Sequence, residues 1–281
     1  MVTHSLSDTG SAGQATVRGM KTPPVALTIA GSDPGGGAGI QADLKVFAAH
    51  GCYGTSVITA LTAQNTLGVH DLYLIPSPVV GTQLASVLDD MPVAAAKVGM
   101  LASAQAAAEV AARARHGAFP HLVIDPVLRA STGRSLGVRA AIERLLPYAT
   151  VLTPNREEAS ALVGWEVTTA ADMAGAAAQL AAGRKVTIVI TGGDMPGEES
   201  VDVIWTEHGA KSLRARRVPT ANNHGTGCTF SAAITALLAH GAEVENAIRL
   251  AKEYVARALT GAVDWRLGAG AGPLDHFEWR R

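Results

Sequence analysis

Aromatic residues, cysteines and unbalanced charge are all scarce in this chain of 281 residues. Phe, Trp and Tyr make up 4% of the sequence and apolar residues 48%, so small aliphatic side chains must fill the core. Two cysteines, Cys52 and Cys228, are too few for a disulfide framework, and we expect both to be free thiols in a reducing cytoplasm. The formal charge of -1, from 23 basic and 24 acidic residues, argues against nucleic acid or an anionic membrane as a partner.

Long apolar runs are also missing. No stretch offers the ~20 apolar residues that would cross a membrane, and residues 1–22 lack the apolar core, about 7 to 15 residues long, of a secretory signal. Because residues 1–22 are polar and rich in Gly, Ser and Thr, we expect them to form a disordered tail. We expect residues 23–281 to form one soluble domain, a size that single α/β domains reach.

What the sequence does contain is an alternation of two patterns. Short continuous apolar runs predict buried parallel strands at 25–31, 53–64, 94–100, 121–127, 149–155 and 185–193. Ala-rich stretches with helical spacing lie between them, at 38–50, 79–90, 103–116, 156–163 and 170–182. This order predicts an α/β domain of three layers with helices on both faces of the sheet. After residue 195 we expect a hairpin within 201–218 and two closing helices, at 225–241 and 244–262.

A glycine-rich loop, "GSDPGGGAG", follows the first predicted strand. Its end fits the G-x-G-x-x-A form of a dinucleotide site, which also requires an acidic residue about 20 positions later for the ribose. The next strand ends instead at Gln64-Asn65, and Asp43 comes too early. Three interpretations stay open: a dinucleotide site, a turn that needs positive φ, and the wall of a pocket for a small ligand.

A second glycine loop, "HGTGC", begins a helix directly. The unpaired backbone N–H groups of Gly225, Thr226 and Gly227 predict a site for a phosphate or a transferring phosphoryl group. Cys228 lies in the first turn, where we expect a pKa lowered from roughly 8.5 towards neutrality, suitable for a base. The alternative is a small buried apolar side chain.

At this point the chain resembles a known family. The segments "ALTIAGSDPGGGAGIQADLKVF", "ITALTAQNTLGV", "AAKVGML", "LVIDPV", "LLPYATVLTPNREEA" and "NHGTGCTFSAAI" are similar in order and spacing to hydroxymethylpyrimidine/phosphomethylpyrimidine kinases of thiamine biosynthesis. These enzymes belong to the ribokinase superfamily. The resemblance covers about residues 24–275 and implies a ribokinase-like three-layer α/β/α sandwich with a mostly parallel central sheet.

The resemblance also implies roles for single residues on the acceptor side. Cys228 would be the base for the substrate hydroxymethyl group, next to the amides named above. Asp43 and Gln64 would bind the pyrimidine, and Gly31 and Met100 would form pocket walls. The chemistry of Gln64 agrees, because an amide matches the amino group and ring nitrogen of an aminopyrimidine. Alternatives stay open: a structural strand end for Gln64, a solvated acid for Asp43 and a core side chain for Met100.

On the nucleotide side the resemblance implies ATP and Mg²⁺. Asn155 and Glu158 match an N-x-x-E motif near the phosphates, Asp125 and Glu158 would assist Mg²⁺ through water, and Thr191 and Gly192 would lie against the nucleotide. A helix-capping pair is the alternative for the N-x-x-E motif.

The chain departs from the family in several places. Many members have lysine where this chain has Ser131, Thr191 and Ala221, which puts efficiency on the monophosphate in doubt; Arg129, Arg134 or Lys97 are candidates to compensate. The resemblance further implies a homodimer and a flap at 127–136. Two other functions stay open: a pyridoxal kinase, and a pyrimidine-binding protein that has lost catalysis.

Overall fold

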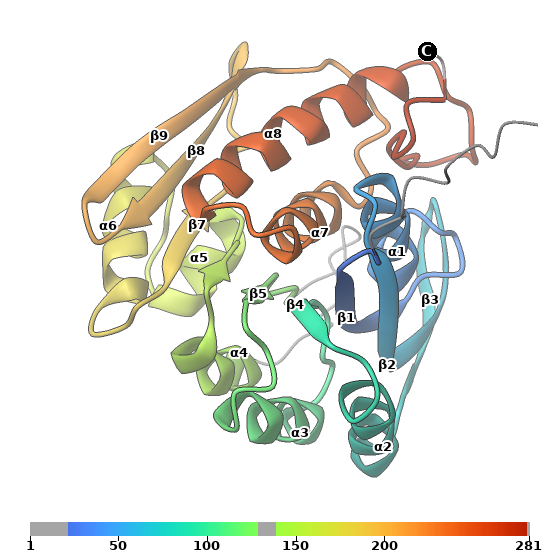
Figure 1. Cartoon of the computed structure of the whole chain (residues 1–281). Helices are drawn as coiled ribbons and strands as arrows, with labels where there is room; N and C mark the ends of the chain where they lie inside the picture. The colour runs from blue at the N-terminus through green and yellow to red at the C-terminus, as the bar shows by residue number, and fades with distance from the viewer. Residues whose placement is uncertain (1–21, 129–138, 280–281) are drawn as a thin grey trace, which may run out of the picture.

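A nine-stranded sheet forms the centre of the protein (Figure 1). The structure, a computed structural model, describes residues 22–128 and 139–279. The strands are β1 Val25–Ser32, β2 Tyr53–Asn65, β3 Gly68–Leu74, β4 Val93–Val98, β5 Leu122–Ile124, β6 Val151–Leu152, β7 Thr187–Ile190, β8 Glu199–Thr206 and β9 Gly209–Arg216. The helices are α1 Gly39–Ala49, α2 Ser77–Leu88, α3 Ala104–Arg115, α4 Arg139–Leu145, α5 Arg156–Val163, α6 Ala170–Ala181, α7 Thr226–Ala239 and α8 Val244–Gly261, with a short 3-10 helix at Leu146–Tyr148.

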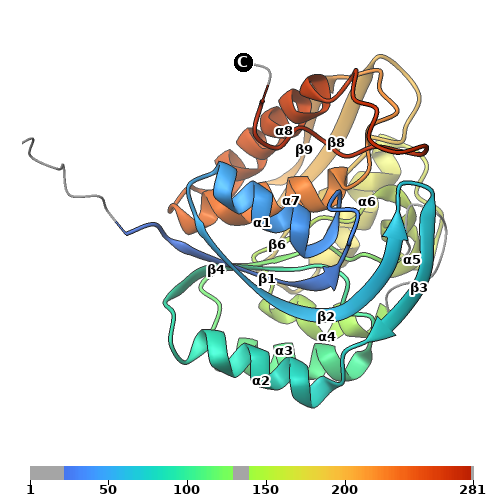
Figure 2. The same ribbon diagram turned by 90° about the vertical axis from the view of Figure 1, so that its right-hand side faces the viewer.

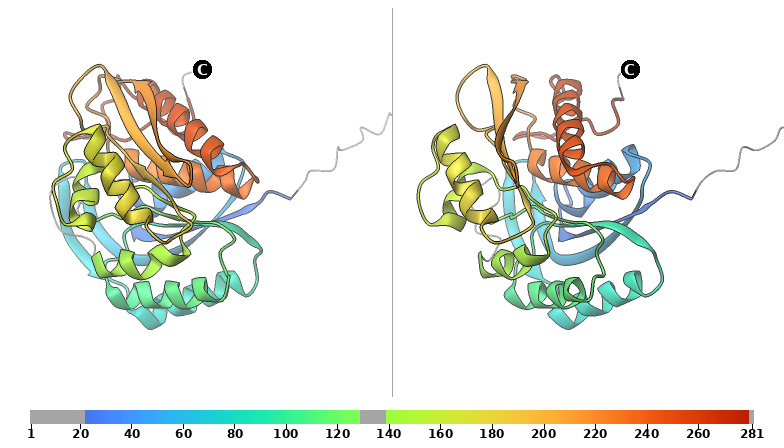
Figure 3. Two further views of the ribbon diagram at one scale, coloured as in Figure 1. Left: turned by 90° about the vertical axis from the view of Figure 1, so that its left-hand side faces the viewer. Right: turned by 60° about the vertical axis from the view of Figure 1, so that its left-hand side comes forward.

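The strands follow the order β3-β2-β1-β4-β5-β6-β7-β8-β9. From β2 to β7 all neighbours run parallel, and antiparallel strands extend both edges. β3 returns beside β2 as a curved pair (Figure 2), and β8 and β9 form a hairpin that runs between α6 and α8 (Figure 3). The sheet is therefore mostly parallel, as predicted.

Helices cover both faces and create two cores. One core packs side chains of α2 to α6 against the sheet, and the other packs α1, α7 and α8 against the opposite face. Successive residues of β1 alternate between them, with Ala26 in the second core and Leu27 in the first. A strand buried on both faces needs apolar residues at every position, which explains the continuous apolar runs. The three-layer prediction is confirmed.

Three elements escaped the sequence analysis, and the strands β5, β6 and β7 are shorter than predicted. The antiparallel strand β3 lies at an edge, where polar side chains interrupt its apolar pattern. Helix α4 and the 3-10 helix after it were likewise not predicted. The outer half of β2 alternates between exposed and covered side chains, since only one of its faces is packed there. Leu61, 44% exposed, lies in this half.

Some sequence expectations concern residues that the structure does not describe. The predicted tail lies outside the described residues except for Thr22, as do Arg129, Ser131, Arg134 and most of the 127–136 segment. Among the described helices, none combines the length and the apolar character needed to cross a membrane.

Candidate active site

A cavity of about 640 Å³ opens at the carboxyl ends of the parallel strands, where loops meet the N-terminus of α7. This is the edge at which open α/β sheets bind ligands, and the volume is typical of small-molecule sites. Most of the predicted site residues line it: Gly31, Gln64, Met100, Asp125, Asn155, Glu158, Thr191, Gly225, Thr226, Gly227 and Cys228. Asp43 and Gly192 do not.

Gly31 and Met100 form one wall of the cavity. A Cβ atom on Gly31 would overlap Cε of Met100, so only glycine at this position leaves the Met100 side chain its place. Met100 is 8% exposed and packs against Ala60 in a small separate cluster. The pair therefore offers a flat apolar surface, with bare backbone beside a thioether, on which a planar ring can lie.

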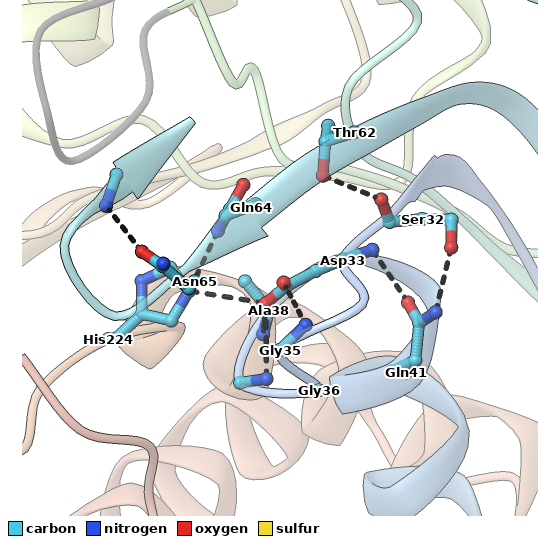
Figure 4. A network of polar contacts seen from close by, with 12 residues as sticks. Ser32, Asp33, Gly35, Gly36, Ala38, Gln41, Thr62, Gln64, Asn65 and His224 are labelled. Atoms are coloured by element: carbon cyan, nitrogen blue, oxygen red, sulfur yellow. Dashed lines mark hydrogen bonds and ion pairs between the residues drawn. The ribbon is translucent and has the colours of Figure 1, made fainter. Parts of the chain in front are cut away.

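The first glycine loop is held by its own carboxylate (Figure 4). Oδ1 of Asp33 accepts a hydrogen bond from the amide of Gly35 at 2.8 Å, and Oδ2 accepts from Gly37 at 3.1 Å and Ala38 at 2.8 Å. Burial alone would raise the pKa of Asp33, but hydrogen bonds from His224 and these amides lower it. A carboxylate thus occupies the donors that a phosphate would need, which argues against the dinucleotide interpretation.

Gln64 reaches the same loop from the end of β2. The pairing of β2 with β3 shifts register between Ala63 and Gln64, and such an irregularity redirects the side chains that follow it. Nε2 of Gln64 lies 3.0 Å from Nε2 of His224, which in turn lies 3.3 Å from Oδ2 of Asp33 (Figure 4). Gln64 therefore lines the cavity and also has the loop partner that the structural alternative expects.

Helix α7 begins at the second glycine loop. Its N-cap, Gly225, has a φ of 84°, and a Cβ atom there would overlap the carbonyl oxygen of Gly37 in the first loop. The amide of Thr226 donates to the carbonyl of Asn223 at 3.3 Å, so it is not one of the unpaired donors that the sequence predicts. The amides of the first turn that follow it, at Gly227 and Cys228, have no acceptor within the helix. They point the positive end of the helix dipole into the cavity.

Cys228 lies in this first turn, half-buried, but its acidity differs from the prediction. Burial raises the pKa of the Cys228 thiol to about 12, and the carboxylates of Asp125 and Asp43 add to the shift. Lys97 and the backbone amide of Gly39 act in the opposite direction without reversing it. The expected lowering towards neutrality is therefore wrong for the ligand-free protein, because desolvation of a thiolate outweighs the effect of the helix terminus.

Asp43 lies behind the cavity wall rather than in it. Its side chain is fully buried in α1, accepts a hydrogen bond from Oγ1 of Thr28 at 2.6 Å and forms an ion pair of 2.9 Å with Nζ of Lys97. The sequence analysis expects Asp43 to bind the pyrimidine, but the structure places its side chain away from the cavity. Burial alone would lower the pKa of Lys97, but the carboxylates of Asp43 and Asp125 raise it, so the ammonium stays charged.

Lys97 connects this pair to the cavity. Its ammonium group lies 3.7 Å from Oδ2 of Asp125, which accepts a hydrogen bond from Oγ of Ser231 on α7 at 3.0 Å. Asp43, Lys97 and Asp125 thus form a connected group of buried charges at the cavity wall, close enough to Cys228 to affect its pKa. Lys97 lines the cavity, but its ammonium group is already paired with the buried carboxylate of Asp43.

Asn155 and Glu158 form a capping box at the start of α5, as the structural alternative predicts. Oδ1 of Asn155 accepts from the amide of Glu158 at 2.8 Å, and Oε2 of Glu158 accepts from the amide of Asn155 at 2.9 Å. Both residues nevertheless line the cavity. Burial raises the pKa of Glu158 to about 8, and the negative charge of Asp125 adds to the shift. Two carboxyl groups thus share one cavity at an energetic cost that a cation would relieve.

The donor set fits Mg²⁺ in the form that the sequence analysis expects. In the described parts of the chain, no cluster of three or more His, Cys, Asp or Glu side chains could hold a metal ion alone. Mg²⁺ is commonly held by one or two carboxylates with water and substrate phosphates completing its shell. Asp125 and Glu158 supply that number, and both line the cavity.

Thr191 and Gly192 separate at the end of β7. Thr191 lines the cavity and pairs with Asn155 in an isolated bridge. Gly192 is buried against β8: its amide donates to Oδ1 of Asp202 at 3.0 Å, and a Cβ atom would overlap the carbonyl oxygen of Val201. Glycine is therefore required here by strand packing, and the predicted approach of a nucleotide to Gly192 is not supported by its position.

The sequence analysis assigned no role to Asp33 or His224, and named Lys97 only as a possible substitute for a missing cation. Asp33 and His224 stand in the two glycine motifs, which could have drawn attention to them. Their mutual contact could not be read from the sequence, because they are 191 positions apart.

Comparisons with known proteins agree with this geometry. Residues 33–275 match the family model of phosphomethylpyrimidine kinase. A hydroxymethylpyrimidine/phosphomethylpyrimidine kinase of Rhizobium meliloti is 42% identical over 258 residues, which cover 90% of this chain and 97% of that protein. The chloroplastic thiamine biosynthetic bifunctional enzyme of Arabidopsis thaliana is 42% identical over 274 residues, and this chain spans only 52% of its length. The crystal structure of an ADP complex of Bacillus subtilis pyridoxal kinase superposes with a TM-score of 0.83 at 38% identity, covering 92% of this chain and 99% of that one.

Proposed function

Since this chain belongs to the phosphomethylpyrimidine kinase family, we propose that it transfers the γ-phosphoryl group of ATP to 4-amino-5-hydroxymethyl-2-methylpyrimidine, and then to the resulting monophosphate. The observation that carries the proposal is one cavity with two chemically different ends. The Gly31, Gln64 and Met100 side suits a flat polar-edged ring, and the α7 N-terminus with Asp125 and Glu158 suits phosphates and a cation. Cys228 lines the same cavity.

On the acceptor side, recognition follows from shape and one amide. The ring lies on the surface formed by Gly31 and Met100, while Gln64 offers both a donor and an acceptor to the edge of the ring. Asp43 supports this end indirectly, through its ion pair with Lys97.

On the phosphate side, charge stabilisation dominates. Phosphoryl transfer usually passes through a loose transition state, so positioned donors matter more than a strong base. The amides at the start of α7 supply those donors. Asp125 and Glu158 would hold Mg²⁺, which would supply positive charge beside the phosphates.

Cys228 receives the proton of the hydroxymethyl group in this proposal. Its raised pKa means that the thiol is protonated in the ligand-free protein, so in this proposal it first loses its own proton to solvent water. The resulting thiolate then takes the hydroxyl proton while the new P–O bond forms and the bond from the γ-phosphorus to the ADP oxygen breaks. Lys97 is the group that the structure provides to stabilise the thiolate. The transfer of the proton then accompanies, rather than precedes, the transfer of the phosphoryl group.

Pyridoxal is the second candidate acceptor. The 38% identity to a pyridoxal kinase over 92% of the chain supports it, and its ring also carries a hydroxymethyl group.

We further propose that the protein is a single domain, is located in the cytoplasm and forms a homodimer. Sedimentation equilibrium tests the dimer.

Release of ADP, measured with each acceptor separately, tests these functions. We expect turnover with the hydroxymethylpyrimidine, slower turnover with its monophosphate because Thr191 and Ala221 are neutral, and weaker activity with pyridoxal. Preference for pyridoxal would favour the second candidate. Absence of turnover with all three, together with measurable binding of the pyrimidine, would identify a binding protein.

A further inference from the structure

The imidazole of His224 contacts Asp33 and Gln64, and the two contacts require opposite protonation of the same ring nitrogen. Its Nε2 atom lies 3.3 Å from Oδ2 of Asp33 and 3.0 Å from the amide nitrogen of Gln64 (Figure 4). One imidazole nitrogen carries either a proton or a lone pair. It therefore cannot donate to the carboxylate and accept from the amide at the same time.

Asp33 determines whether Nε2 of His224 carries the proton or the lone pair. Its carboxylate accepts three backbone N–H groups of the glycine loop and is nearly inaccessible to solvent, so it is ionised and only accepts hydrogen bonds. A lone pair on Nε2 facing it at this distance would be repelled. The proton of His224 consequently belongs on Nε2.

Gln64 has to adapt to that proton. The oxygen and nitrogen of its amide exchange places when the last torsion turns by about 180°, and hydrogen bonding decides which orientation is populated. Because Nε2–H of His224 is a donor, the Gln64 amide is more stable with its oxygen, Oε1, towards His224 and its NH₂ group turned away. The ring lies close against Gly37, where a Cβ atom would lie 2.6 Å from Cδ2 of His224.

We infer that His224 is a positioning residue that sets the orientation of the Gln64 amide. Asp33 holds the imidazole proton on Nε2, and that proton attracts the amide oxygen of Gln64. His224 thereby fixes which side of the amide offers a hydrogen-bond donor, and which an acceptor, to the substrate ring. This inference rests on the proposed function, in which Gln64 binds the ring. A ring that offers adjacent donor and acceptor atoms, as an aminopyrimidine does, is matched by one orientation only. A pyridine ring without that edge depends on the orientation much less.

The first test needs no measurement of activity. In protein with ¹⁵N-labelled histidine, the ¹⁵N chemical shifts distinguish a protonated Nε2 from a bare one. We expect His224 to hold its proton on Nε2 in the native protein and to lose that preference in Asp33→Asn. A bare Nε2 in the native protein overturns the inference.

The second test measures specificity. His224→Phe keeps a ring against Gly37 but removes both nitrogens, and His116→Phe, at an exposed helix end, is the matched control. We expect kcat/KM for the hydroxymethylpyrimidine to fall by about 10-fold, the equivalent of one lost hydrogen bond, mainly through KM, and that for pyridoxal to fall less than about 3-fold. Equal losses for both substrates, or no loss for either, would overturn the inference.

Failure of the proposed function gives a different result. If the native protein phosphorylates neither substrate, calorimetric dissociation constants of the two rings replace kcat/KM. The same selective weakening in His224→Phe then supports the inference, and its absence contradicts it. The NMR result is unaffected in either case.

Discussion

The carbonyl oxygen of Gly37 occupies the space that a Cβ atom on Gly225 would need. Two loops far apart in the sequence thus meet backbone to backbone at the cavity. Gly39 strengthens the same junction, since its amide contacts the Cys228 thiol. The relative position of ring and phosphate therefore depends on a contact that tolerates no side chain.

Gly225→Ala should destabilise the fold and abolish kinase activity. A φ of 84° costs a side chain about 1–2 kcal/mol, and overlap with backbone adds roughly 1–3 kcal/mol. Gly183→Ala, with a φ of 71° and no atom within 4 Å of a Cβ, isolates the first effect. Urea unfolding of both variants checks the difference; equal losses of stability would show that the loop contact contributes nothing.

Cys228→Ala should lower kcat by about 10²- to 10⁴-fold, the usual contribution of a general base, and leave pyrimidine binding nearly unchanged. Cys52→Ala is the control, because Cys52 is buried away from the cavity beside the Ala236 carbonyl. Steady-state kinetics and calorimetry separate the two effects. A kcat near that of the native protein would remove Cys228 from the mechanism.

The thiols should react slowly with iodoacetamide near pH 8. Burial raises the pKa of Cys52 to about 11 and that of Cys228 to about 12, so each is almost entirely protonated there. Since only the thiolate reacts, the rate should rise about 10-fold for each pH unit. Mass spectrometry of the alkylated peptides measures it, and rapid labelling of Cys228 at pH 7 would contradict the raised pKa.

Glu158→Gln should stabilise the ligand-free protein at pH 8 but not at pH 5. Burial and Asp125 raise the pKa of Glu158 from its ordinary value of 4.5 to about 8. The folded protein therefore binds more protons than the unfolded chain between these values, and stability is lost as the pH rises through that window. Glutamine keeps the capping geometry without the charge. Thermal unfolding checks this, with Glu166→Gln as the exposed control; parallel pH profiles for native and variant proteins would refute it.

Lys97→Met should destabilise the fold by about 3–5 kcal/mol, because it leaves the carboxylate of Asp43 buried without its partner. The double variant Asp43→Asn, Lys97→Met removes both charges and should recover a large part of that loss. Urea unfolding of the singles and the double completes the cycle. Additive effects would show that the two side chains do not depend on each other.

Periodicity and turn residues predicted most of the fold. Strands β1, β4 and β7 are buried at nearly every position and mostly apolar because both faces are packed, and that pattern is local. The edge strand β3 carries polar residues on an open face and gives a weaker signal. The glycine loops were likewise visible, since their conformation is a property of a few neighbouring residues.

The chemistry of the site was less accessible to sequence analysis. Asp43 has a helical position that does not reveal Lys97 beside it, 54 positions away. Gly192 looks like a nucleotide contact until the carbonyl of Val201 is known to lie against it. The pKa of Cys228 depends on how deeply the first turn is buried. Each of these properties depends on contacts between segments that are distant in the sequence. A local sequence pattern does not contain that information.

The carboxylate of Asp33 inside the glycine loop has a consequence for binding thermodynamics. A loop stabilised by its own side chain keeps its shape whether or not a ring is present, so little conformational entropy is lost in this wall when substrate arrives. We therefore expect the wall formed by this loop to act as a rigid template, with the same shape before and after a ring binds.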